Sequence, residues 1–149
     1  MEYKTLVREL GEKLGLELDG VCSDMTRNVK AARDPEYAKV YDVVLAANEA
    51  ASVAAKPGIT AGALDAVARK IIRKAGYGKA FWHSLGHGGG YEIHEEPCAR
   101  QESKTVLEPG MFVTIEPGIY IEGHLGVRIE DLVLITTTGC EVLSHSPKR

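Results

Sequence analysis

The pattern of apolar positions predicts a long helix over residues 35–56. Alanines recur there at helical spacing together with larger apolar residues, which is typical of a helix packed on several sides. Asp34 and Pro35 indicate its start, because an aspartate caps free N–H groups and a proline needs no donor in the first turn. Pro57 and Gly58 predict its end.

A second helix is predicted between Thr60 and Gly76. Thr60 suits the N-cap position and Gly76 suits the position just past a helix end. The apolar residues between them fall on one helical face. They are Leu64, Val67, Ala68, Ile71, Ile72 and Ala75. We interpret both helices as scaffold and assign them no chemistry.

The first part of the chain allows two interpretations. Over residues 5–18, leucines recur at helical spacing up to Leu14 and then alternate with other residues as in a half-buried strand. A strand from Leu14 is favoured, because Asp19-Gly20 is a strong hairpin signal and residues 21–27 can return as the partner strand. This interpretation places Asp24 on a strand, where an aspartate needs a partner.

Two apolar runs in the second half of the chain predict strands. The first, residues 111–121, is expected to be interrupted at Pro117-Gly118, and the second covers residues 127–136. Each run contains a glutamate, Glu116 or Glu130. A lone carboxylate among apolar residues is expensive to desolvate, so the pair suggests that the two glutamates share a cation.

Length and composition indicate one ordinary globular domain. The 149 residues are 44% hydrophobic and 26% charged, which is enough for a single core. A net charge of −3 gives no reason to expect nucleic acid or a membrane as a partner. No apolar run could span a bilayer and no signal peptide is recognisable, so a cytoplasmic location is expected.

Residues 83–96 gather polar and small residues. They hold three of the five histidines, four of the sixteen glycines and three carboxylates, which a segment built only to pack would not need. A site is predicted here. The run Gly88-Gly89-Gly90 lacks the lysine and the helix pattern of a phosphate-binding loop, so that interpretation is discarded.

Four dispersed residues are candidate ligands of one divalent cation: Asp24, His87, Glu116 and Glu130. Three carboxylates with one imidazole suit manganese, cobalt, zinc or iron(II). This donor set argues against a metal site built on cysteine thiolates. A divalent cation lowers the pKa of a water that it binds and polarises a carbonyl group. Hydrolysis is therefore the expected reaction class.

Four motifs together resemble those of the pita-bread metallopeptidases, which include methionine aminopeptidases, and most closely the Xaa-Pro aminopeptidase and prolidase branch. The motifs are Ser23-Asp24-Met25-Thr26-Arg27, His83-Ser84-Leu85-Gly86-His87-Gly88, Ile115-Glu116-Pro117-Gly118-Ile119-Tyr120 and Val127-Arg128-Ile129-Glu130-Asp131. The resemblance implies an α+β fold in which a curved antiparallel sheet is flanked by helices. It also implies a two-metal site that cleaves the bond preceding proline, in short peptides with proline at the second position.

The resemblance implies a metal-binding role for each candidate ligand. Asp24 and Glu130 resemble the carboxylates that bridge two metal ions. His87 and Glu116 resemble ligands of one of these ions, and a carboxylate, Glu116 in our interpretation, would shuttle the proton.

Three further residues match family positions that face the substrate. His94 resembles the histidine that contacts the substrate and steadies the tetrahedral intermediate. His83 would line the pocket, and Arg128 would lie beside Glu130 and orient it without binding the metal itself.

One position departs from the family pattern. The family's first metal-binding aspartate stands eleven residues before the bridging aspartate, and here that register falls on Lys13. Either the positive Lys13 ammonium partly takes the place of the second metal ion, because one divalent ion leaves excess negative charge among three carboxylates, or Lys13 points into solvent. One ion or two are therefore expected. Residues 1–149 are expected to form a single catalytic-type domain that is incomplete at its N-terminus and lacks the family's N-terminal domain.

The first functional hypothesis is therefore a metal-dependent peptidase of the Xaa-Pro type. The alternative is a non-catalytic homologue that keeps the scaffold as a binding or interaction module, which Lys13 favours and the intact ligand set opposes. An incomplete sheet exposes an unpaired edge, so association into a homo-oligomer is also expected, with a partner chain as one source of the lost half.

Overall fold

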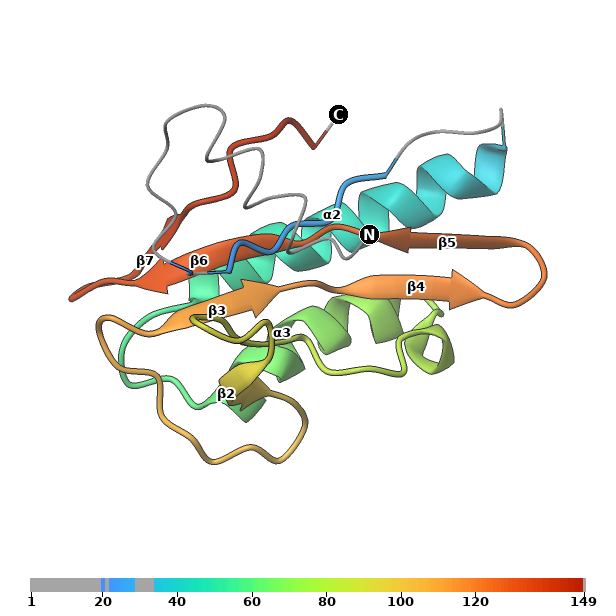
Figure 1. Cartoon of the computed structure of the whole chain (residues 1–149). Coiled ribbons are helices and arrows are strands. Elements are labelled where there is room, and N and C mark those ends of the chain that lie inside the picture. The colour runs from blue at the N-terminus through green and yellow to red at the C-terminus, as the bar shows by residue number, and fades with distance from the viewer. Residues whose placement is uncertain (1–19, 21, 29–33, 149) are drawn as a thin grey trace, which may run out of the picture.

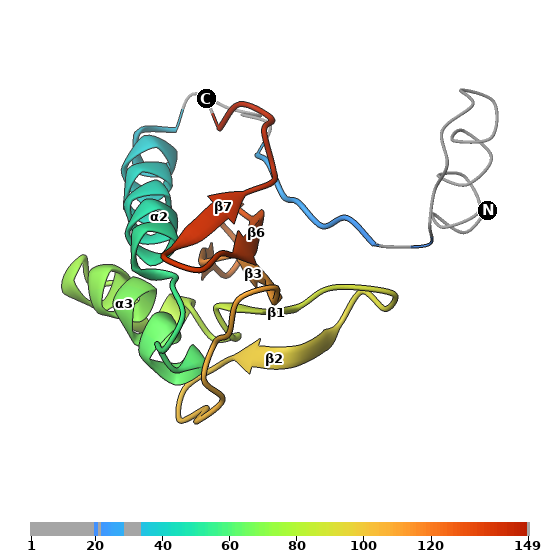
Figure 2. The ribbon, with the colours of Figure 1, turned by 90° about the vertical axis from the view of Figure 1, so that its left-hand side faces the viewer.

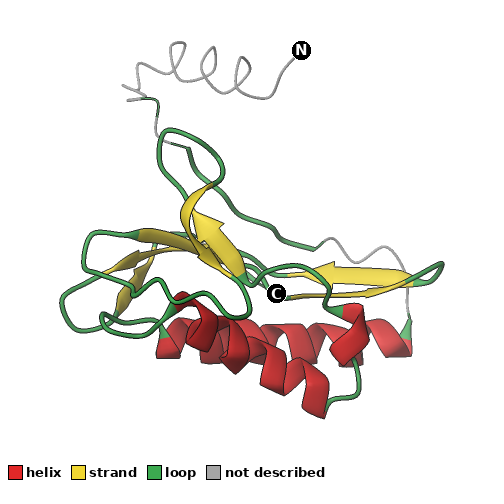
Figure 3. Cartoon of the chain, turned by 90° about the horizontal axis from the view of Figure 1, so that it is seen from below, coloured by secondary structure: helices red, strands yellow, loops and turns green. Residues whose placement is uncertain are grey.

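The computed structural model describes residues 20, 22–28 and 34–148. Lys13 and the strand predicted from Leu14 lie outside the described residues. In the described part of the chain, two long helices lie on one side of a layer of short antiparallel strands (Figures 1 and 3). The elements are α2 (Pro35–Ala54), α3 (Ala61–Lys74), the 3-10 helix η1 (Gly78–Ala80), β1 (Gly86–Gly88), β2 (Glu95–Ala99), β3 (Phe112–Ile115), β4 (Gly118–Ile121), β5 (Leu125–Arg128), β6 (Asp131–Ile135) and β7 (Cys140–Val142).

Both predicted helices are confirmed, including their starts. The Asp34 side chain accepts a hydrogen bond from the Glu36 N–H at 2.8 Å, and the Thr60 hydroxyl accepts one from the Ala63 N–H at 3.1 Å. Each helix ends within two residues of its predicted end. The two helices pack against each other, so together they form one layer (Figure 3).

Strand pairing divides the described strands into two antiparallel sheets. Five strands form one sheet in the order β2-β1-β3-β6-β7 (Figure 2), and β4 pairs with β5 alone. Ile115 lies opposite Asp131 at the end of the β3–β6 pair, and Gly118 lies opposite Arg128 at the start of the β4–β5 pair. The two pairs lie end to end (Figure 1), so the chain passes twice across the junction between them.

The prediction of one continuous strand over residues 127–136 is wrong, because Ile129 and Glu130 separate β5 from β6. The break in the other run falls one residue before its predicted position, at Glu116 and Pro117. Proline has no N–H to donate across the ladder, so regular pairing cannot continue through this point. Both glutamates therefore lie in gaps between strands rather than within strands.

The strand predicted over residues 21–27 does not form in its described part, residues 22–27. One end of this segment bonds through its main chain to Gly90, whereas the Thr26 carbonyl accepts from the Glu130 N–H as part of an isolated bridge. A strand needs successive hydrogen bonds to one partner, and these two bonds go to different partners. Asp24 consequently lies on an extended, non-strand segment between these two bonds.

The apolar core fills the space between the helices and the strands. Its fully buried side chains include Val40, Val44, Leu64, Ile72, Leu85, Val113, Ile115, Ile129 and Val133. The apolar positions predicted on α2 contribute Val40, Val44, Ala47 and Ala51 to it, and those predicted on α3 contribute Leu64, Ala68 and Ile72. Within the described ranges, neither helix has the length and apolar character needed to cross a membrane.

A buried ion pair on α3 holds the chain that leads into β1. The Arg69 guanidinium donates to both carboxylate oxygens of Asp65 at 2.7 Å. It also donates to the carbonyl oxygens of Phe81 at 2.8 Å and His83 at 2.9 Å. Asp65 in turn accepts from the Leu85 N–H at 3.1 Å. One helix turn of α3 therefore fixes the path of the segment that follows η1.

Replacing Asp65 with alanine is expected to lower the free energy of unfolding by about 3–5 kcal/mol, because Arg69 would stay buried without its partner. Urea denaturation followed by circular dichroism measures this change. Glu49→Ala is the control, since Glu49 is an exposed carboxylate on α2 and its loss should change stability by less than about 0.5 kcal/mol. Equal losses in the two variants would contradict the structural role of the ion pair.

Candidate metal centre

The four predicted metal ligands converge at the junction between the two sheets. Asp24, His87 and Glu130 each offer one ligand atom, and these three atoms all lie within 4.8 Å of one another. The Nε2 atom of His87 lies 3.6 Å from Asp24 Oδ2 and 3.5 Å from Glu116 Oε1. The set combines an extended segment, one strand and the two strand gaps.

Two glycines allow β1 to carry His87 into this cluster. A Cβ atom at Gly86 would lie 1.8 Å from the Thr114 carbonyl oxygen, and one at Gly88 would lie 2.2 Å from the Glu96 carbonyl oxygen. Neither approach leaves room for a side chain, so these positions require glycine. Close packing of β1 between β2 and β3 thus depends on the glycines that flank the histidine.

The orientation of the His87 ring is set by the main-chain carbonyl of the next residue, Gly88. Its Nδ1 atom lies 2.9 Å from the Gly88 carbonyl oxygen. Because a carbonyl oxygen can only accept, Nδ1 carries the proton in this contact. The lone pair of Nε2 then points toward the carboxylates, as a metal ligand requires.

Two threonines that we did not predict as site residues hold the ligands. The Thr114 hydroxyl accepts from the His87 N–H at 2.9 Å and donates to Glu116 Oε1 at 3.4 Å. The Thr26 hydroxyl donates to Glu130 Oε2. Each threonine stands two residues from a ligand along extended chain, so threonine and ligand share a face. That spacing is the sequence signal that could have identified them.

The carboxylates of this cluster are crowded and only partly neutralised. Burial, and next the nearby charge of Glu130, raises the pKa of Glu116 to about 7. Burial likewise raises the pKa of Glu130. Arg128 opposes both shifts, with its Nη1 atom 3.7 Å from Glu116 Oε2, and it reaches Glu130 through Thr26, to whose hydroxyl its Nε donates at 3.2 Å.

This donor set fits a divalent cation. The ligand atoms are carboxylate oxygens and one imidazole nitrogen, which is the chemistry that hard and borderline divalent metals prefer. The carboxylates carry more negative charge than Arg128 can balance. A cation among them would offset the burial, and next the repulsion, that raise the pKa values of Glu116 and Glu130.

A cavity of about 640 Å³ opens beside the cluster. The four residues expected to act on substrate all border it. They are His83, His94, Glu116 and Arg128. Trp82 and Tyr120 add aromatic faces to the same cavity, and their ring centres lie 5.5 Å apart. The ligand cluster therefore borders a space large enough for a small ligand.

The two other cavity histidines have different surroundings. The ring centre of His94 lies 4.3 Å from that of His87, and His94 is exposed. His83 donates through Nδ1 to the Ser84 carbonyl at 2.7 Å, so its Nε2 accepts the Tyr120 hydroxyl at 3.0 Å. Burial lowers the pKa of His83, which keeps its imidazole neutral. His94 is thus free to meet a ligand, whereas His83 is already hydrogen-bonded at both nitrogens.

Sequence comparison gives relatives of known class. Residues 13–137 match the model of metallopeptidase family M24. The chain is 51% identical over 127 residues to an Xaa-Pro dipeptidase of Pyrococcus furiosus, a match that covers 85% of this chain and 36% of that protein. It is 49% identical over 136 residues to a putative dipeptidase of Bacillus subtilis, with 91% of this chain and 38% of that protein covered.

Solved structures of prolidases and X-Pro aminopeptidases have the same fold as this chain. A prolidase from Pyrococcus horikoshii superposes with a TM-score of 0.84 at 48% identity, over 87% of this chain and 38% of that one. An X-Pro aminopeptidase from Thermotoga maritima superposes with a TM-score of 0.85 at 42% identity, over 90% of this chain and 38% of that one. The predicted α+β pita-bread fold is confirmed, although the chain spans less than two fifths of the length of these relatives. The chain belongs to metallopeptidase family M24, the family that its four motifs resemble.

Proposed function

We propose that this chain binds a divalent metal ion through Asp24, His87, Glu116 and Glu130 and hydrolyses the bond before proline in short peptides. The observation that carries the metal site is the convergence of these four groups, two of which, His87 and Glu116, line the cavity. Similarity to proteins named Xaa-Pro dipeptidase supports the choice of substrate.

A bound divalent ion would lower the pKa of a water molecule and polarise the scissile carbonyl. The residues of the chain would supply the remaining steps. Glu116 borders both the ligand cluster and the cavity, so its carboxylate can take a proton from the attacking water and pass it to the leaving nitrogen. His94 faces the same cavity and can donate a hydrogen bond to the carbonyl oxygen as negative charge develops there.

Aromatic side chains support a substrate with a compact apolar ring. Trp82 is 74% exposed at the cavity edge, and Tyr120 lies beside it. The neutral His83 holds the Tyr120 hydroxyl, so the tyrosine ring is fixed while the Trp82 ring stays accessible. A proline ring could pack against these faces without having to satisfy a main-chain N–H, which it lacks.

Self-association, cytoplasmic location and the choice among manganese, cobalt and zinc stay predictions from the sequence. The alternative is a non-catalytic binding module, which would keep the scaffold without taking up a metal. A measurement of metal binding distinguishes it from the peptidase.

The purified chain is expected to bind about one Mn²⁺ or Co²⁺ ion, and His87→Ala is expected to abolish that binding by removing the one nitrogen ligand. Isothermal titration calorimetry and elemental analysis after dialysis measure it. His145→Ala is the control, since His145 is an exposed histidine outside the cluster. A Lys13→Asp variant should raise the stoichiometry above one. A wild-type chain that takes up no ion would favour the binding module instead.

With Mn²⁺ or Co²⁺ added, the chain is expected to hydrolyse an Xaa-Pro dipeptide. His94→Ala should lower kcat by roughly 10²-fold to 10³-fold, because the developing charge would lose its donor. Metal binding by this variant should be unchanged, and the His145→Ala control should keep full activity. A wild-type rate no higher than that of His87→Ala would contradict the proposed reaction.

In the metal-free protein, Glu116→Gln is expected to raise the melting temperature more at pH 8 than at pH 5. The Glu116 pKa is raised from 4.5 to about 7 by folding, so its stabilising contribution is complete below about pH 4.5 and is lost as the pH rises through 7. The neutral amide of Glu116→Gln does not ionise and so avoids this loss of stability. The difference in melting temperature should amount to a few degrees. Thermal melts in EDTA test it, with exposed Glu49→Gln as control. Parallel wild-type and Glu116→Gln curves would refute the shift.

A further inference from the structure

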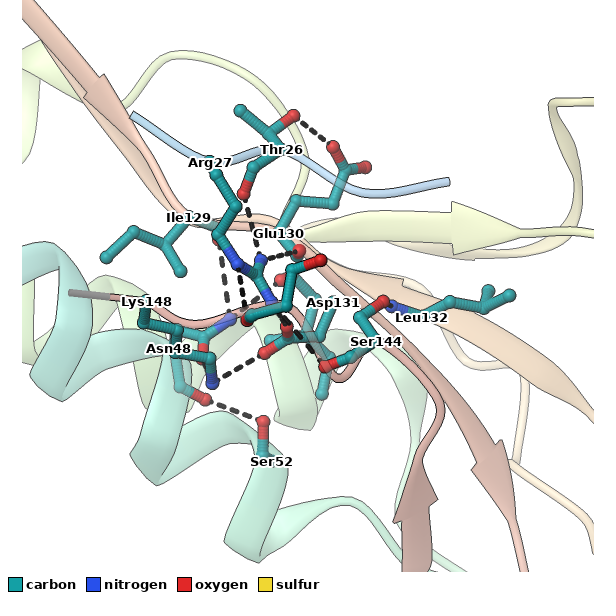
Figure 4. A network of polar contacts seen from close by, with 12 residues as sticks. Thr26, Arg27, Asn48, Ser52, Ile129, Glu130, Asp131, Leu132, Ser144 and Lys148 are labelled. Atoms are coloured by element: carbon teal, nitrogen blue, oxygen red, sulfur yellow. Dashed lines mark hydrogen bonds and ion pairs between the residues drawn. The ribbon is translucent and has the colours of Figure 1, made fainter. Parts of the chain in front are cut away.

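Asn48, in the middle of α2, contacts the main chain just before both ligand glutamates. Its side chain is fully buried. The Nδ2 atom donates to the Ile115 carbonyl oxygen at 3.0 Å and to the Ile129 carbonyl oxygen at 3.3 Å. These carbonyls belong to the residues that precede Glu116 and Glu130, and Figure 4 shows the amide next to the second of them.

The rest of the Asn48 side chain fixes which way the amide points. Its Oδ1 atom accepts from the Lys148 ammonium at 2.8 Å, and the same ammonium lies 2.7 Å from Asp131 Oδ2 (Figure 4). An ammonium can only donate, so the amide oxygen must face Lys148 and the nitrogen must face the two carbonyls. Both N–H groups of the amide are thereby used.

The main chain at the junction makes this contact important. The Glu116 N–H donates to the Leu85 carbonyl at 2.8 Å, whereas the Glu130 N–H donates to the Thr26 carbonyl at 3.1 Å. The two ligand residues thus bond to different neighbours. The carbonyls before them turn the other way, toward α2, where one amide nitrogen joins the two segments.

We infer that Asn48 is a positioning residue that sets the separation of Glu116 and Glu130, and with it the affinity and geometry of the metal site. The inference rests on the proposed metal-binding function. Asn48 does not line the cavity, and its Nδ2 atom donates to main-chain carbonyls, so we expect it to act through the main chain at the two strand gaps.

Asn48→Leu keeps the size and removes both donors. We expect the affinity for Mn²⁺ to fall by about 10-fold to 100-fold, as is typical when a group that orients metal ligands is lost. Isothermal titration calorimetry on the full chain measures the affinity. The visible absorption band of bound Co²⁺ provides a second readout, and it should change in shape because the two glutamates would no longer hold the same spacing.

Two control variants separate positioning from general stability. Val44→Ala lies one turn earlier on α2 and leaves a cavity in the core, so it should lower the melting temperature while leaving the affinity within about threefold and the Co²⁺ band unchanged. Lys148→Ala removes the contact to Oδ1 but keeps both N–H donors. The two carbonyl oxygens can only accept, so they still require the amide nitrogen to face them, and metal affinity should be unchanged. If Asn48→Leu does not fold, Asn48→Ala removes the same donors without adding bulk.

The outcomes distinguish this inference from the proposed function. A weaker affinity and an altered band in the folded Asn48 variant, with Val44→Ala normal, support the positioning role. A folded Asn48 variant that matches Val44→Ala in both readouts overturns it while leaving the metal site intact. A wild-type chain that binds neither Mn²⁺ nor Co²⁺ overturns the metal site and this inference together.

Discussion

Two antiparallel strand pairs meet end to end beside the cavity, and the hydrogen-bond ladder cannot run through the place where they meet. Pro117 has no N–H. The N–H groups of Glu116 and Glu130 bond to Leu85 and Thr26, which lie outside both strand pairs. The main chain is therefore free to turn two acidic side chains toward one point. An unbroken ladder would instead have kept successive side chains alternating between the two faces of the sheet.

A broken ladder leaves polar main-chain groups that must find partners inside the protein, because a buried carbonyl without a partner is destabilising by about 1–3 kcal/mol. The helix layer provides donors for them. Asn48 on α2 serves the two carbonyls at the junction, and Arg69 on α3 serves the carbonyls of the chain that leads to β1. The helices thus contribute two buried polar anchors as well as an apolar face, and each anchor lies behind a segment that carries cavity side chains.

The sequence was informative where a local rule decides the structure. Both helices could be predicted from their caps and apolar faces, since Asp34 and Thr60 bond to the first turns as expected. Strand β1 escaped prediction, because it contains two glycines around a histidine and has no apolar alternation. Its strand state depends on the close approach of β2 and β3, which no local pattern encodes.

The four candidate ligands were identified from carboxylates within apolar runs, from a histidine-rich segment, and from motifs that resemble a family, since their spacing along the chain does not bring them together. Supporting residues gave a weaker signal or none. Thr114 and Thr26 stand two residues from a ligand, a spacing that would have placed them on the same face. Asn48 lies in an alanine-rich helix, where a lone polar residue is indistinguishable in sequence from one that faces solvent. Its partners are main-chain groups 67 and 81 residues away.

The hydrogen bonds that hold the junction also act against repulsion among the carboxylates. Besides burial, the charge of Glu130 raises the pKa of Glu116, and the charge of Asp24 raises the pKa of Glu130. Like charges repel, so without an opposing force the segments that carry them would move apart when these groups are ionised. The Asn48 amide and the Thr26 and Thr114 hydroxyls oppose that movement by hydrogen bonds to the main chain and to the carboxylates. In the proposed metal site, the fold would therefore set the spacing of the ligands before any ion binds. Ligands held at a fixed spacing would favour ions of matching size and charge, because the protein would not close around every cation equally well.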